Sequence, residues 1–191
     1  GVAGVIKAVA IQSDGRILIG GTFRSVGGVA VTNLARLLPG GAVDTTFAAT
    51  GTDTEVLAIT IQPDGRILIG GLFTKVNGVN AGRIARLLPS GALDPAFQAG
   101  SGANDYVSAI SVQTDGLIVV GGGFNQFNGQ YRGRLTRLNA DGSPDPTINF
   151  GSGADKFVSS AVVQPFDGKI VIGGGFTSFD GVNRTALARL F

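Results

Sequence analysis

One segment of the sequence occurs four times at nearly constant spacing. "IQPDGRILIGGLF" at residues 61–73 has close counterparts at residues 11–23, 112–124 and 163–176. The interval between copies is 50, 51 and 51 residues, measured between Gln12, Gln62, Gln113 and Gln164. Repeats of about 20–50 residues indicate solenoids, propellers or arrays, in which one small unit is built again and again. This repeat constrains the fold more than any other feature of the chain.

The second copy shows how each unit is built. We expect strands at 56–61, 66–73 and 83–88, a loop with an Asn-Gly turn signal at 74–82, and a short outer strand at 92–97. The tripeptides "PDG" and "PSG" between these segments are typical turn sequences. The run "ILI" does not alternate with polar residues, as a strand with one water-facing side would. It favours a strand packed on both sides, as in a propeller blade.

The sequence therefore predicts an all-β fold, a β-propeller of four-stranded blades of about 50 residues with almost no helix. The expected repeats are about 1–48, 49–99, 100–150 and 151–191, in a single domain. The fourth copy ends at Phe191, before its outer strand. We therefore expect a longer natural chain, or a neighbouring subunit of a homo-oligomer, to complete that blade. A chain without any methionine is expected to be a processed product or an excised piece.

An arginine and an aspartate recur eight residues apart, separated by a three-residue turn that ends in glycine. The pairs are Arg36 with Asp44, Arg86 with Asp94, and Arg137 with Asp145. With such a hairpin turn, residue 86 faces residue 94 across the two strands. We interpret the pairs as structural ion pairs that fix strand register. The fourth copy has Arg189 without an equivalent aspartate.

The composition excludes several kinds of chemistry. The chain has no histidine and no cysteine, which leaves no imidazole base for a nucleophilic triad and no usual zinc ligand set. Its net charge of +2 is spread along the chain, which does not favour nucleic-acid binding. No apolar run approaches the roughly 20 residues that span a bilayer. The glycine pairs precede neither Lys-Ser/Thr nor a helix, so no phosphate loop is predicted.

Carboxylates and loops leave few candidates for a site. The only glutamate, Glu55, stands beside Asp53, and the repeated "DG" aspartates are turn residues. We predict no catalytic residue, no cofactor and no metal. Tyr131 is not repeated in the other copies and lies in a loop with Gln130 and Arg132, so these three are the candidate binding residues.

The units "AIxxQPDGRILIGG-F", "RIARL" and "LDPAF-GSGAN" resemble the delta-60 repeat family over essentially the whole chain. This resemblance implies kelch-like propeller blades in large secreted or cell-surface proteins of bacteria, and no defined catalytic residues. The fourth copy departs from the pattern by the inserted Phe166 and by the missing "LDPAF".

Three functions are weighed on these grounds. The first is a non-catalytic surface or secreted scaffold whose loops bind a protein or a glycan for adhesion. The second is a structural spacer or assembly element of a fibre or surface complex, because open strand edges invite partners. The third, a polysaccharide-acting enzyme, is a minor alternative.

Overall fold

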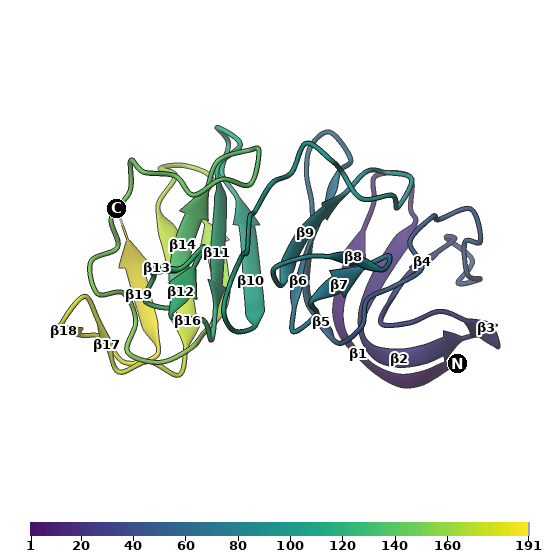
Figure 1. Cartoon of the computed structure of the whole chain (residues 1–191), viewed down its shortest axis with the longest axis horizontal. Coiled ribbons are helices and arrows are strands. Elements are labelled where there is room, and N and C mark those ends of the chain that lie inside the picture. The colour runs from purple at the N-terminus through teal and green to yellow at the C-terminus, as the bar shows by residue number, and fades with distance from the viewer. Residues whose placement is uncertain (191) are drawn as a thin grey trace. The chain divides into compact units, whose positions relative to one another are not determined.

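Each copy of the repeat folds into a sheet built on three antiparallel strands, and a short fourth strand joins the sheet of the first copy. We call these sheets blades 1 to 4 (Figure 1). This computed structural model describes residues 1–190, and these residues form strands, turns and loops without a helix. Blades 1 and 2 are built from β1 (Val2–Ile11), β2 (Ile17–Val26) and β4 (Leu34–Leu37), and from β5 (Val56–Ile61), β6 (Ile67–Gly71) and β9 (Ile84–Leu87). Blades 3 and 4 are built from β10 (Val107–Val112), β11 (Ile118–Gly122) and β14 (Leu135–Leu138), and from β15 (Val158–Val163), β16 (Ile170–Gly174) and β19 (Leu187–Leu190).

The loop after the second strand of each blade folds into a small hairpin of its own. These hairpins are β7 (Lys75–Val76) with β8 (Val79–Asn80), β12 (Gln126–Phe127) with β13 (Gln130–Tyr131), and β17 (Ser178–Phe179) with β18 (Val182–Asn183). In blade 1, β3 (Val29–Ala30) pairs with the end of β2. The turn residues Asn77 and Gly78 have φ of 52° and 77°, as a type I′ turn requires. The predicted Asn-Gly turn is therefore confirmed, and its flanks form strands where we expected only loop.

The expected outer strand is reduced to one bridge in each of blades 1 to 3. Leu87 pairs with Leu93, as the predicted facing of residues 86 and 94 requires, and Leu37–Val43 and Leu138–Pro144 repeat the bridge. Pairing stops there because the following aspartate turns the chain, and in blades 2 and 3 the next residue is a proline without an N–H. In blades 1 to 3 the predicted outer strand is thus represented by a single residue pair.

The described chain divides into two compact units, Gly1–Pro95 and a second that starts at Ala96. Unit 1 holds blades 1 and 2, and unit 2 holds blades 3 and 4. The prediction that all four copies form a single domain stays a prediction.

Within each unit the core lies between its two blades. In unit 1, β5 contacts β1 and β2, and the buried cluster includes Leu18, Leu34, Val56, Ile67 and Phe73. In unit 2, β15 contacts β10 and β11, and the corresponding cluster includes Val119, Leu135, Val158, Ile170 and Phe176. Every residue of β6 and β11 is buried, which confirms the prediction that these strands pack on both faces.

Blade 1 differs from the others by its longer strands. β1 and β2 have 10 residues each, whereas β5 has 6 and β6 has 5. The extension pairs Val2 with Val26, in the place where later copies have a polar loop. In this extension Ala3 stands where blade 2 has Asp53.

Candidate functional site

The loop before the first strand of blade 2 anchors the small hairpin that follows the second strand. The carboxylate of Asp53 accepts hydrogen bonds from the Thr74 and Lys75 amides, both at 2.9 Å, and from the Thr74 hydroxyl at 2.6 Å. Burial pushes the pKa of Asp53 upward, but these hydrogen bonds outweigh it and leave that pKa below its ordinary value. Asp53 is therefore an anion whose hydrogen bonds fix the loop before β5 to the small hairpin.

The same arrangement recurs in blades 3 and 4. The side chain of Asn104 accepts from the Asn125 and Gln126 amides at 3.0 Å. The carboxylate of Asp155 accepts from the Thr177 amide at 2.8 Å and from the Ser178 amide at 3.0 Å. The Ser178 amide and the Thr177 hydroxyl lower the pKa of Asp155 to about 2. One oxygen acceptor at this position thus sets the loop geometry in three blades.

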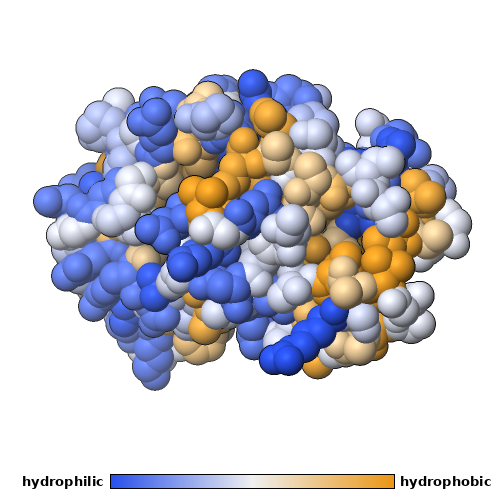
Figure 2. Space-filling model, turned by 45° about the vertical axis from the view of Figure 1, so that its right-hand side comes forward, coloured by the Kyte–Doolittle hydropathy of each residue, from blue (hydrophilic) through white to orange (hydrophobic). Residues whose placement is uncertain are grey.

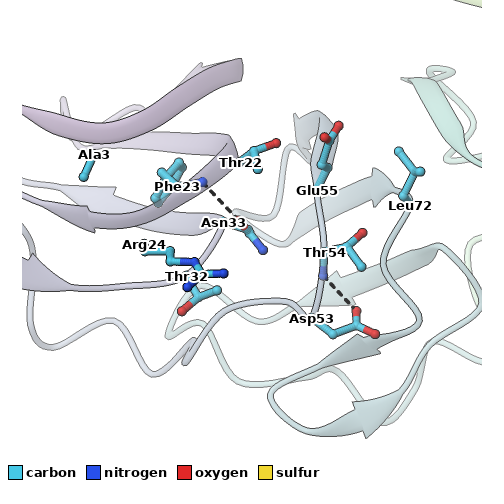
Figure 3. A pocket seen from close by; sticks show the side chains of 10 residues that line it. All are labelled: Ala3, Thr22, Phe23, Arg24, Thr32, Asn33, Asp53, Thr54, Glu55 and Leu72. Atoms are coloured by element: carbon cyan, nitrogen blue, oxygen red, sulfur yellow. Dashed lines mark hydrogen bonds between the residues drawn. The ribbon is translucent and has the colours of Figure 1, made fainter.

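A hollow of about 830 Å³ opens beside this loop in unit 1 (Figure 3). We call it hollow 1; its polar and exposed lining comprises Thr22, Arg24 and Thr32 from blade 1, and Thr54, Glu55 and Leu72 from blade 2. Asn33 forms part of its wall and holds the two blades together. Its Oδ1 accepts from the Phe23 amide at 3.1 Å, and its Nδ2 donates to the Thr52 carbonyl at 3.0 Å.

The charges in hollow 1 are not equally available to a ligand. Glu55 accepts a hydrogen bond from Lys7 Nζ at 2.8 Å, and this bond lowers the pKa of Glu55 despite its partial burial. Arg24 is exposed, and among the described residues no group forms a hydrogen bond or ion pair with its guanidinium. The hydroxyls of Thr32 and Thr54 are likewise free within residues 1–190. Hollow 1 therefore offers one free cation and two free hydroxyls.

Unit 2 has a smaller hollow at the equivalent place, of about 280 Å³, which we call hollow 2. Asn125, Arg134 and Asp155 line it where unit 1 has Arg24, Asn33 and Asp53. The Tyr131 ring also lines hollow 2, and its hydroxyl donates to the Ser152 carbonyl at 3.1 Å. The tyrosine thus occupies space that is open in unit 1.

The sequence-predicted binding residues lie around this tyrosine. Gln130 and Tyr131 form β13, and both are exposed, Tyr131 with 60% of its surface accessible. The Arg132 guanidinium donates to the Tyr131 carbonyl at 2.8 Å. Tyr131 and Arg132 both line a further hollow of about 320 Å³ in unit 2. Gln130 lines neither this hollow nor hollow 2. The structure brings Tyr131 and Arg132 together, but the arginine is engaged with backbone.

The arginine–aspartate pairs lie at the outer edges of the first three blades. The Arg36 Nε–Asp44 Oδ2 distance is 2.8 Å, and the Arg86–Asp94 and Arg137–Asp145 distances are 2.7 and 2.6 Å. Each aspartate side chain is 2–3% exposed, and the arginines are 8%, 6% and 15% exposed. In blade 4, Arg189 instead bonds to Asp167 at 2.5 Å and to Gln164 at 2.6 Å, and it is 53% exposed.

In unit 1 the first of these pairs also connects the two blades. Arg36 donates to the Pro89 carbonyl at 2.6 Å and stacks over the Phe47 ring, 4.5 Å from its centroid. The Thr46 hydroxyl and amide, together with Arg36, keep the pKa of Asp44 below its ordinary value. This geometry assigns Arg36 and Asp44 to holding the blades in register rather than to a ligand.

Sequence reasoning missed Arg24, Thr32 and hollow 1. A signal was present: the position after the strand-end phenylalanine is Arg24 in blade 1 but Thr74, Asn125 and Thr177 in the others. A second signal lies directly before the strand-end phenylalanine. Blades 3 and 4 have Gly123 and Gly175 at this position, whereas blades 1 and 2 have Thr22 and Leu72. Tyr106 and Phe157 cover those glycines, so a Cβ there would lie 2.3 and 2.5 Å from the rings.

No cluster of three or more His, Cys, Asp or Glu side chains that could hold a metal occurs in the part of the chain that the structure describes. No helix long and apolar enough to cross a membrane is found in that part either.

Comparisons with known proteins agree with this architecture. A solved structure described as "Crystal structure of WD40 beta propeller domain of Doa1" is 16% identical in sequence, with a TM-score of 0.62 over 97% of this chain. The chain spans about half the length of that structure, since 50% of it is covered. No curated protein matches the chain. The family model "Domain of unknown function (DUF5122) beta-propeller" matches residues 12–47, 62–97, 113–147 and 167–191. These four ranges make up more than half of the sequence, and each begins after the first strand of one blade and includes its next two strands, so the chain belongs to the DUF5122 β-propeller family.

Proposed function

We propose that this chain is a non-catalytic binding module, and that hollow 1 holds a glycan that carries a carboxylate group. The observation that carries the proposal is the unpaired, exposed Arg24 guanidinium in a hollow of about 830 Å³. A guanidinium has a planar fork of donors that matches a carboxylate, and its charge needs no proton uptake at any physiological pH.

The rest of the hollow suits a sugar. The free hydroxyls of Thr32 and Thr54 can donate to or accept from sugar hydroxyls. Leu72, which is 41% exposed, provides an apolar surface for the carbon–hydrogen face of a sugar ring. Asn33 and Asp53 are already bonded to backbone, so they hold the walls in place before a ligand arrives.

The state of the carboxylates supports binding rather than hydrolysis. A glycosidase needs one carboxyl with a raised pKa as its general acid. The pKa values of both Asp53 and Glu55 are instead lowered, Glu55 chiefly by Lys7 and Asp53 by its threonine and amide donors. Screening on a polysaccharide panel tests this part of the proposal, since release of reducing ends would contradict it.

We place the module outside the bacterial cell, secreted or attached to the surface, where it serves adhesion. The delta-60 resemblance of the repeats supports this location, and the kelch-like glycine pair at each strand end is part of that resemblance. A surface role also suits rigid blades that present loops of differing sequence, such as Thr74–Gly82 and Asn125–Gly133.

Binding to immobilised glycans tests the proposed ligand. We expect the chain to bind a polyuronate more tightly than its methyl-esterified form, and Arg24→Ala to weaken this binding about 10- to 100-fold. This range corresponds to the loss of one charge-assisted hydrogen bond, about 1.5–3 kcal/mol. The binding should also weaken as the salt concentration rises.

Arg184→Ala is the matched control, because Arg184 is exposed in unit 2 and its loss changes the net charge equally. Its binding should equal that of the wild type. Equal binding by the Arg24→Ala variant, or a preference for acidic peptides over acidic glycans, would contradict the glycan proposal.

A second candidate function is assembly, as a spacer or a part of a larger surface structure. It is favoured by apolar side chains that are exposed on the sheets themselves, including Val9 at 59% and Leu187 at 65%. Large exposed apolar groups on a sheet face indicate a surface that another molecule covers.

A further inference from the structure

The joint between the two blades of a unit depends on a valine that packs over a glycine. In unit 1, Val56 of blade 2 lies over Gly20 of blade 1, where a Cβ would be 2.6 Å from Val56 Cγ1. In unit 2, Val158 of blade 4 lies over Gly121 of blade 3, and the same distance is 2.8 Å. Both valines are completely buried. The glycine is therefore a socket that only a side chain from the next blade fills.

The cross-strand neighbour of each socket completes the joint. Leu34 pairs with Gly20 and Leu135 pairs with Gly121, so each leucine lies on the same face of its sheet as the socket. Leu34 is 0% exposed and Leu135 is 1% exposed. A joint thus consists of a valine from one blade and a glycine–leucine pair from the other.

Blade 1 has the first half of such a joint on the face turned away from blade 2. Ile6 stands six residues before Gln12, as Val56 stands before Gln62, and it is 39% exposed. Val9 and Ile11 lie along the same strand with 59% and 69% of their surface exposed. Figure 2 shows hydrophobic residues that reach the surface among polar ones.

Blade 4 has the second half on the face turned away from blade 3. Gly173 corresponds to Gly20 and Gly121, but a Cβ there would meet only the Ser160 hydroxyl and the Ala186 carbonyl within 4 Å. Leu187 pairs with Gly173 and is 65% exposed, in contrast to its buried counterparts. Val162, on the neighbouring strand, is 60% exposed. The socket and its leucine are formed but uncovered.

We propose that two copies of this chain join head to tail, with Ile6 of one copy seated over Gly173 and Leu187 of the other. The joint reproduces, between molecules, the contact that Val56 and Val158 make within the units. The joint is heterologous, because two different surfaces meet. Each copy has both surfaces, the one with Ile6 on blade 1 and the one with Gly173 and Leu187 on blade 4. The proposal is independent of the glycan site, because Ile6, Gly173 and Leu187 do not line hollow 1.

Cysteine pairing tests the joint directly, because these 191 residues include no cysteine. In unit 1 a Cβ on Gly20 would be 3.0 Å from the Val56 Cβ, close to the roughly 3.5–4.5 Å of a disulfide. We expect a mixture of Ile6→Cys chains and Gly173→Cys chains to form a disulfide-linked dimer under mild oxidation. Each variant alone should form far less, because like positions do not meet in a head-to-tail joint.

Sedimentation provides a second test without oxidation. The wild type should associate with rising concentration, and Ile6→Asp and Leu187→Asp should each remain monomeric. An equimolar mixture of these two variants should form a heterodimer and nothing larger, because it contains one intact joint. Phe166→Ser is the control, since Phe166 is fully exposed on a turn and its loss should leave association unchanged.

Three outcomes would overturn the proposal. One is a wild type that stays monomeric up to about millimolar concentration. Another is association that Ile6→Asp abolishes and Leu187→Asp leaves intact, which indicates a symmetric contact between like faces. The third is an intramolecular disulfide in an Ile6→Cys, Gly173→Cys double variant at nanomolar concentration, which indicates a chain that covers its own faces. Circular dichroism of each variant separates these outcomes from a failure to fold.

Discussion

Units 1 and 2 have the same backbone plan but use different side chains at equivalent places. The joint between blades is alike in both, a valine over a glycine. The hollow beside it is not: unit 1 leaves about 830 Å³ open beside Arg24, whereas unit 2 has about 280 Å³ beside Tyr131. The repeat therefore preserves what holds blades together and varies what a ligand would touch.

The outer ion pairs also differ between the units. In unit 1 the buried Asp44 faces two arginines, Arg36 at 2.8 Å and Arg16 at 3.3 Å. In unit 2 the second arginine is replaced by Leu117, and Arg137 makes additional hydrogen bonds to Gln113 and Thr147 at 3.3 and 3.2 Å. Asp94 likewise faces Arg86 at 2.7 Å and Arg66 at 3.2 Å, so each buried carboxylate of unit 1 has two arginines, whereas in unit 2 Arg137 distributes its bonds over several acceptors.

The largest expected effect comes from removing the Asp44 carboxylate. Asp44→Ala should lower the free energy of unfolding by about 3–5 kcal/mol, because it leaves Arg36 buried without its counter-charge. Asp145→Ala should cost less, about 1–3 kcal/mol, since Arg137 keeps two side-chain acceptors and is more exposed. Urea unfolding measures both.

Arg189→Ala serves as the control for this pair, because Arg189 is 53% exposed and bonds across the surface of blade 4. Its loss should change the unfolding free energy by less than about 1 kcal/mol. A loss at Asp145 as large as that at Asp44 would contradict the proposed difference between the units.

A middle-sized effect tests what the units share. Gly20→Ala and Gly121→Ala should each destabilise by about 1–3 kcal/mol, since the new methyl group overlaps Val56 or Val158. Gly173→Ala should stay within about 0.5 kcal/mol, because its methyl group would meet mainly a movable serine hydroxyl. Thermal unfolding of dilute samples ranks the three variants. A Gly173→Ala variant that loses as much as Gly121→Ala would show that the glycine serves the strand itself and not the joint.

The sequence alone was sufficient for the shared part of the molecule. The spacing of the four glutamines and the non-alternating "ILI" predicted packed blades, and the turn length predicted the bridge between Leu87 and Leu93. These features depend on short segments that recur in every copy, so an interpretation of one copy can be compared with the other three.

The candidate site could not be predicted in the same way, because it depends on which side chains are missing. Unit 1 has Ala30 at the position of Tyr131, the residue whose side chain lines the smaller hollow 2. Tyr131 is predicted to be a binding residue because it is an unrepeated aromatic residue in a loop. In the structure its side chain lines hollow 2. Arg24 is free because the two carboxylates that line hollow 1 are bonded elsewhere, Asp53 to Thr74 and Lys75 and Glu55 to Lys7, and such bonding is a property of the folded chain.

The smallest expected effect concerns the loop acceptor, which is a carboxylate in Asp155 and an amide in Asn104. The pKa of Asp155 is about 2 in the folded chain against an ordinary 3.8, so its carboxylate stabilises the fold fully above pH 3.8. That contribution disappears as the pH falls from about 4 to about 2, because a proton then binds the folded state as well. Asp155→Asn should keep the two amide hydrogen bonds, as Asn104 does, but without this dependence on pH.

The urea midpoints of the wild type and the Asp155→Asn variant, compared at pH 7, 4 and 2.5, measure this effect. The wild type should be the more stable protein at pH 7, and the two midpoints should converge toward pH 2.5. Asp53→Asn should behave in the same direction in unit 1, since its pKa is also lowered, although burial opposes the shift there. A difference that stays constant between pH 7 and pH 2.5 would mean that the charge of Asp155 contributes nothing. The oxygen alone would then hold the loop, and the exchange of aspartate for asparagine between blades 3 and 4 would carry no energetic consequence.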